Sequence, residues 1–136
     1  MPEATLYDQA GGMAFFEKLV DRFYQGVRTD PVLRPMYAAQ EDFSGPRRRL
    51  TLFLVQYWGG PTTYLEERGH PRLRARHFPF SIGDLERDRW LHHMQVAIDA
   101  SEATPDVRDQ LQAYMTKAAD AMRNRDEVAD ENPAAG

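Results

Sequence analysis

Histidine is the residue type in this sequence best suited to hold a metal, and there are four: His70, His77, His92 and His93. Cysteine is absent, which excludes disulfides, thiolate zinc sites, iron–sulfur clusters and cysteine nucleophiles. Any metal must therefore be held by His, Asp, Glu, Tyr or Met. Because most histidines are ordinary core or surface residues, each one is judged by its neighbours along the chain.

His77 has the most informative surroundings. It follows Arg76 and precedes a Phe-Pro-Phe run at 78–80, so a cation flanks it on one side and apolar rings on the other. An imidazole beside aromatic residues is what an axial haem ligand requires. The segment 68–82 around it contains four arginines and no acidic residue. Three interpretations are open: a solvated loop, a phosphate or nucleic-acid patch, or a clamp for an anionic cofactor, since arginine binds carboxylates well.

The other histidines offer weaker metal sites. Glu67 and His70 have the spacing of one half of a di-iron carboxylate site, but the sequence holds no second copy, and the Gly-His-Pro run interrupts helical geometry. His92 and His93 are adjacent, so on a helix they point about 100° apart and cannot chelate one metal. We expect His92 to be solvated, His93 to lie near a buried stripe, and both to be structural.

Helices must position these side chains, because apolar residues recur at helical spacing. Four principal amphipathic helices are expected: 13–28, a second from 44–46 to about 58, 84–101 and 104–122, with a short helical segment at 62–67. Thr104 is suited to cap the last of these, and Pro105 to occupy its first turn. No alternating strand pattern occurs, so the predicted fold class is all-α.

Composition limits the class of protein further. The chain has 136 residues, of which 42% are hydrophobic and 28% charged, with a net charge of −4. These values indicate a soluble globular domain, expected at 1–123, with a frayed polar tail at 124–136. The mild acidity argues against a nucleic-acid partner. No apolar run approaches the roughly 20 residues of a membrane span, and no signal-peptide pattern is visible, so we expect a cytoplasmic location and no membrane partner.

Several ordered segments resemble the truncated haemoglobins of the second group, in which a distal tryptophan is characteristic. The most specific are Gly-His-Pro-Arg-Leu-Arg-Ala-Arg-His-Phe-Pro-Phe at 69–80 and Glu-Arg-Asp-Arg-Trp-Leu at 86–91, with further matches at 7–12, 22–24, 30–37 and 53–61. The resemblance covers about residues 5–123. It implies a truncated globin fold, a two-over-two α-helical sandwich around one haem b (iron protoporphyrin IX).

The resemblance also implies roles for individual residues. His77 matches the proximal iron ligand, and Tyr24, Tyr37 and Trp90 match polar residues on the distal side. The positions that match haem-propionate contacts are Arg49, Tyr64 and Arg76. Apolar haem contacts are implied for Leu50, Phe53, Leu54, Phe78, Phe80, Ile82 and Met94.

Two features qualify these roles. Pro46 stands where many globins place a distal hydrogen-bonding side chain, and proline has no N–H to donate to a ligand. Tyr24 and Trp90 lie on apolar helix stripes, where an aromatic residue is usually part of the core. A buried Tyr hydroxyl or Trp N–H nevertheless needs a partner, which a small bound ligand would supply.

Three functions are compatible with these observations. The first is a haem protein that binds or transports O2 and binds similar ligands such as CO, NO or peroxide, with Tyr and Trp hydrogen bonding on the distal side. The second is a haem enzyme of the peroxidase or nitric oxide dioxygenase type. Because the sequence shows no flavin or nicotinamide domain, it would need an external reductant, supplied by an unknown reductase. The third is a haem-free helical interaction module. A homodimer is an open alternative for the assembly.

Overall fold

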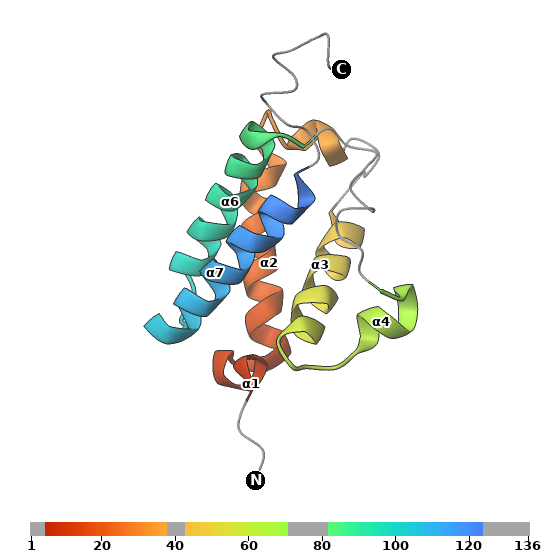
Figure 1. Ribbon diagram of the computed structural model, residues 1–136, viewed down its shortest axis with the longest axis vertical. Helices are drawn as coiled ribbons and strands as arrows, with labels where there is room; N and C mark the ends of the chain where they lie inside the picture. Colours follow the sequence, from red (N-terminus) through yellow and green to blue (C-terminus); the bar gives the residue numbers. More distant parts are fainter. Residues whose placement is uncertain (1–4, 38–42, 71–81, 124–136) are drawn as a thin grey trace.

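The computed structural model describes residues 5–37, 43–70 and 82–123, and every regular element in these ranges is helical (Figure 1). The elements are α1 (Leu6–Ala10), α2 (Gly12–Arg28), the 3₁₀ helix η1 (Arg34–Tyr37), α3 (Ser44–Tyr57), α4 (Thr63–Arg68), α6 (Asp84–Asp99) and α7 (Pro105–Met122). The expected all-α class is confirmed, and the four principal helices lie close to the expected ranges as α2, α3, α6 and α7. The tail 124–136 lies outside the described residues.

The helices form two antiparallel pairs, α2 with α3 and α6 with α7 (Figure 1). The pairs are joined because α2 also packs against α6. Helix α1 lies at one end of the bundle, against α2 and α7, and α4 packs beside α3. This is the two-over-two arrangement that the family resemblance implied, with the core between the pairs.

Helix α2 supplies much of that core. Its buried residues recur at intervals of three and four, so they form one stripe that faces α3 and α6. They are Phe16, Leu19, Val20, Phe23, Tyr24 and Val27. Helix α7 contributes a second stripe and begins as expected, because the Thr104 side chain accepts a hydrogen bond from the Val107 backbone N–H, with Pro105 in the first turn.

Helix α1 was not anticipated by apolar spacing. It forms because Thr5 and Asp8 make a reciprocal capping box: Thr5 Oγ1 accepts from the Asp8 N–H at 3.2 Å, and the Asp8 carboxylate accepts from the Thr5 N–H at 3.4 Å. Gly11 then turns the chain sharply into α2 with a φ of +121°, a backbone angle that side-chain-bearing residues rarely adopt. Across the described ranges, no helix is both long and apolar enough to cross a membrane.

Candidate functional site

A pocket opens where η1, the start of α6 and the end of α7 meet. Its volume is about 380 Å³, open mouth included. It is lined by Leu33, Met36, Tyr37, Ile82, Glu86, Arg87, Trp90, Ala119 and Met122. Three of the residues singled out from the sequence, Tyr37, Ile82 and Trp90, therefore meet at one cavity, although Tyr37 is distant along the chain from the other two. Most of the lining is apolar, as is typical of a cofactor pocket.

Two tyrosines meet beside this pocket. The rings of Tyr24 on α2 and Tyr37 on η1 are perpendicular, with centroids 5.7 Å apart. Phe43 completes the group, with its ring centroid 5.4 Å from that of each tyrosine. The hydroxyls of Tyr24 and Tyr37 share a hydrogen bond. Two phenol protons are thus present, and only one of them is used between the rings.

The surroundings keep both phenols protonated. Burial raises the pKa of Tyr24 well above its usual value, and the neighbouring Tyr37 raises it further. Burial also raises the pKa of Tyr37, although the hydrogen bond with Tyr24 and the charge of Arg49 oppose that rise. Arg49 on α3 is therefore close enough to act electrostatically on both tyrosines. Each tyrosine consequently remains a hydrogen-bond donor at neutral pH.

Trp90 joins this cluster through Phe23. The ring centroids of Phe23 and Trp90 are 5.1 Å apart, and those of Phe23 and Tyr24 are 4.9 Å apart. Trp90 is half-buried and projects from α6, whereas Phe23 and Tyr24 are buried on α2. The packing of α2 on α6 thus brings the three candidate distal residues into a single aromatic cluster at the pocket.

Helix α3 contributes further candidate residues to the core. Phe53 and Leu54 are buried on it, and Leu50 is half-buried against the same core. The rings of Phe53 and Tyr64 meet edge to face, with centroids 5.8 Å apart, which ties the buried Tyr64 of α4 to α3. Pro46 is buried in the first turn of α3. Met94, by contrast, is fully buried in the core on α6, whereas Ile82 lines the pocket.

An ion pair holds α4 in place. Two nitrogens of Arg48 on α3 donate to the two carboxylate oxygens of Glu67 on α4, at 2.6 and 2.8 Å. The Oε1 atom of Gln56 also accepts from the backbone N–H of Leu65 at 2.7 Å. Glu67 is thus engaged with an arginine. In the parts of the chain that the structure describes, no group of three or more His, Asp or Glu side chains could hold a metal ion.

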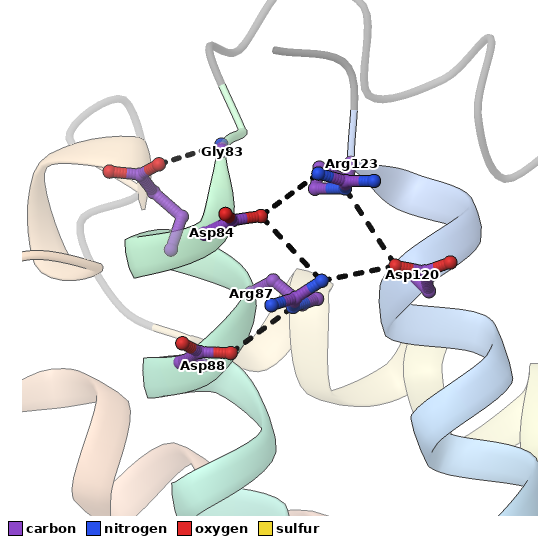
Figure 2. A network of polar contacts seen from close by, with 7 residues as sticks. Gly83, Asp84, Arg87, Asp88, Asp120 and Arg123 are labelled. Atoms are coloured by element: carbon purple, nitrogen blue, oxygen red, sulfur yellow. Dashed lines mark hydrogen bonds and ion pairs between the residues drawn. The ribbon is translucent and has the colours of Figure 1, made fainter. Parts of the chain in front are cut away.

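Charged residues form a network at the rim of the pocket (Figure 2). Arg87, which lines the pocket, lies 3.1 Å from Asp88 and from Asp120, and 3.6 Å from Asp84. Arg123 pairs with Asp84 at 2.9 Å. These contacts join the start of α6 to the end of α7, the two helices that form one side of the pocket.

Asp30 is the residue that sequence reasoning missed. In the sequence it stands just past the expected helix 13–28 and before Pro31, with nothing to mark it as a site residue, but its side chain is completely buried. It accepts hydrogen bonds from the backbone N–H groups of Val32 and Leu33, from Nε of Arg89 and from Nε2 of His93. No local pattern links position 30 to positions 89 and 93. The expected difference in exposure holds, because His92 is exposed while His93 is largely buried.

Four of the candidate residues, His77, Arg76, Phe78 and Phe80, lie outside the described residues. The described ones fit a largely apolar group that also meets hydrogen-bond donors. Apolar side chains dominate the pocket, and the donor side chains of Tyr37 and Trp90 lie on its wall. The donor set also fits small uncharged ligands, because phenol and indole groups donate hydrogen bonds without bringing a charge into the site.

Comparison with known proteins agrees with this geometry. The family model for the bacterial-like globins matches residues 5–124. The group 2 truncated haemoglobin YjbI of Bacillus subtilis (strain 168) is 38% identical to the chain over 122 residues, which is 90% of this chain and 91% of that protein.

Solved structures show the same relationship. A haemoglobin from the actinobacterium Thermobifida fusca is 55% identical, with a TM-score of 0.86 over 89% of this chain and 98% of its own. One from Chloroflexus aurantiacus is 47% identical, with a TM-score of 0.87 over 90% and 100%. The group II truncated haemoglobin from Bacillus anthracis is 36% identical, with a TM-score of 0.87 over 93% and 95%.

Proposed function

We propose that this chain, which belongs to the bacterial-like globin family as a group II truncated haemoglobin, binds haem b through His77. In this proposal Tyr24, Tyr37 and Trp90 hold a small ligand. Membership of the globin family implies haem binding and small-ligand binding. Our proposal adds the type of haem, the ligating histidine, the residue roles and a globin domain at 1–123.

One observation carries this proposal: the hydrogen-bonded tyrosine pair and Trp90 share one aromatic cluster at the pocket. Haem, when bound, supplies an iron atom that takes up O2 and other diatomic ligands. The chain supplies the donors. Trp90 can donate only through its indole N–H, while the tyrosine pair has one proton left beyond the bond between its own hydroxyls.

These donors act by retaining the ligand. A hydrogen bond of this kind contributes about 1–2 kcal/mol, which corresponds to an escape rate roughly five- to thirty-fold lower for each donor. The cluster is fixed before the ligand arrives, so little reorganisation is needed. Pro46 cannot contribute a donor, and distal hydrogen bonding is therefore assigned to the aromatic cluster.

The test is an absorption spectrum of the purified protein, after expression with haem supplied. We expect a Soret band, and a five-coordinate ferrous spectrum for a protein held by one histidine. A colourless protein that takes up no haem would contradict the proposal and favour the haem-free interaction module.

The same cluster favours a second function. The remaining tyrosine proton and the Trp90 indole N–H are two donors at one pocket, which favours retention over release. Retention suits chemistry on the ligand better than its delivery. We therefore keep, as a second candidate, peroxide reduction or nitric oxide oxidation with electrons from an external reductase. Steady-state peroxide turnover no faster than that of free haem would exclude the peroxidase form. A cytoplasmic location and a homodimer remain predictions.

A further inference from the structure

We infer that the buried carboxylate of Asp30 is a positioning residue for the distal site. It holds η1, which carries Tyr37, against α6, which carries Trp90. This inference rests on the proposed function, because it concerns the donors assigned there, and it adds a residue that does not itself line the pocket. The side chain of Asp30 is completely buried.

On one side, the carboxylate shapes the turn that leads into η1. Oδ1 of Asp30 accepts from the N–H of Val32 at 2.8 Å and from the N–H of Leu33 at 3.3 Å. The backbone carbonyl of Asp30 also accepts from the N–H of Arg34, the first residue of η1, at 2.8 Å. Leu33 lines the pocket, and Tyr37 ends the same 3₁₀ helix. The conformation at Asp30 therefore sets where this wall of the pocket begins.

On the other side, the carboxylate binds two side chains of α6 that flank Trp90 in the sequence. Oδ2 of Asp30 lies 2.9 Å from Nε of Arg89 and 2.6 Å from Nε2 of His93. Arg89 directly precedes Trp90, and His93 follows one helical turn later. These two contacts, one on either side of Trp90, fix the position of α6 along its axis and its rotation about that axis. The direction of the indole ring depends on both.

The contact between His93 and Asp30 depends on the absence of a side chain at Gly26 on α2. A Cβ atom at Gly26 would lie 2.2 Å from Nδ1 of His93, so only glycine lets the imidazole reach Asp30 along this path. A buried carboxylate is costly unless it is paired and hydrogen-bonded, and an apolar residue would fill the same space at less cost. A buried charge with four donors therefore fixes the relative positions of the groups that donate to it.

The experiment measures O2 dissociation by stopped flow in the haem-loaded protein and its Asp30→Asn variant. Asparagine keeps the shape and still accepts from the turn, but it loses the charge that holds Arg89 and His93. We expect dissociation to accelerate about three- to ten-fold, because the Trp90 hydrogen bond would be weakened by misalignment and not removed. The matched control is Asp21→Asn, which removes an exposed ion pair between α2 and Arg47 and should leave the rate unchanged.

Repeating the measurement in the Trp90→Phe variant separates an effect of Asp30 on the position of Trp90 from a general structural effect. If Asp30 acts through Trp90, then Asp30→Asn should accelerate dissociation in the native background and have little effect in the Trp90→Phe background. Equal acceleration in both backgrounds, or none in either, would overturn the inference while leaving the proposed function intact. Should Asp30→Asn fail to fold, the same cycle is run with His93→Phe, and with His93→Gln, whose amide N–H should restore much of the native rate.

A readout that needs no ligand keeps the two proposals distinguishable. The indole N–H of Trp90 gives its own proton–nitrogen resonance, assigned by its loss in Trp90→Phe. We expect this resonance to shift in Asp30→Asn and to stay in place in Asp21→Asn. If the protein took up no haem, the proposed function would fail, and an unmoved indole resonance would then reject the role of Asp30 independently.

Discussion

The rings of Tyr24 and Tyr37 stand perpendicular to each other, with centroids 5.7 Å apart, and their hydroxyls share a hydrogen bond between α2 and η1. This contact makes the two phenols a unit: the orientation of each hydroxyl depends on the other. Removing either one changes what its partner offers to a ligand.

We therefore predict that Tyr24→Phe accelerates O2 dissociation about five- to thirty-fold, because the ligand loses a hydrogen bond of about 1–2 kcal/mol. The double variant Tyr24→Phe/Tyr37→Phe should show less than the sum of the two single effects in free energy, since the hydroxyls act together. Stopped-flow measurement of O2 dissociation in the single and double variants tests both expectations. Tyr114→Phe on α7 is the control, and rates that do not change in Tyr24→Phe would contradict the assigned role.

Trp90→Phe should accelerate O2 dissociation by a similar factor. Phenylalanine keeps an aromatic ring against Phe23 but removes the indole N–H, the only hydrogen-bond donor of that side chain. Trp58→Phe is a matched control, because it makes the same change at Trp58, which directly follows α3 and packs against Tyr114. Equal O2 dissociation rates in native protein and Trp90→Phe would contradict the assignment of Trp90 as a distal hydrogen-bond donor.

His77→Ala should abolish tight haem binding or the five-coordinate ferrous spectrum. This prediction comes from the sequence, since His77 lies outside the described residues. The measurement is the absorption spectrum of the reduced protein after haem is added. His92→Ala, which changes an exposed histidine on α6, should leave the spectrum normal. A normal five-coordinate spectrum in His77→Ala would refute the ligand assignment.

Asp30 should make stability depend on pH in acid. Burial by itself would raise the pKa of its carboxyl, but the hydrogen bonds from His93, Val32, Arg89 and Leu33 outweigh this and hold the pKa well below its ordinary value of 3.8. The folded protein therefore binds this proton less readily than the unfolded chain does. The stabilisation is complete above the ordinary pKa and is lost progressively as the pH falls below it.

Urea unfolding of native protein and Asp30→Asn over a pH series tests this expectation. The variant should be clearly less stable at neutral pH, and the difference should shrink as the pH falls below about 4. A stability difference that stays constant down to pH 2 would mean that the ionised carboxylate is not what stabilises the native fold.

Gly26→Ala should destabilise the fold by about 1–3 kcal/mol, the usual cost of overpacking. The added Cβ would lie 2.2 Å from Nδ1 of His93, so the imidazole must turn away from Asp30. Thermal unfolding measures the loss. Gln25→Ala, at the neighbouring exposed position of α2, is the control and should not lower the melting temperature. An unchanged melting temperature in Gly26→Ala would show that α2 and α6 can separate freely at this point.

Local signals in the sequence were sufficient for the four principal helices. The apolar stripe of α2 and the capping of α7 by Thr104 depend on residues only three or four positions apart, so they can be predicted without knowledge of the fold. The short helix α1 escaped notice because five residues are too few to show a periodicity. It depends instead on the capping box between Thr5 and Asp8.

The sequence by itself determined the helical class, the family resemblance and a set of candidate site residues. Only the tertiary structure decided which side chains meet: Tyr24 with Tyr37, Phe23 with Trp90, and Asp30 with His93, 63 positions further along the chain. It also placed Met94 in the core and Ile82 on the pocket wall. The physical reason is range. Helix formation depends on neighbours within a turn, whereas contact between distant side chains depends on how α2, η1 and α6 pack, and no short segment encodes that.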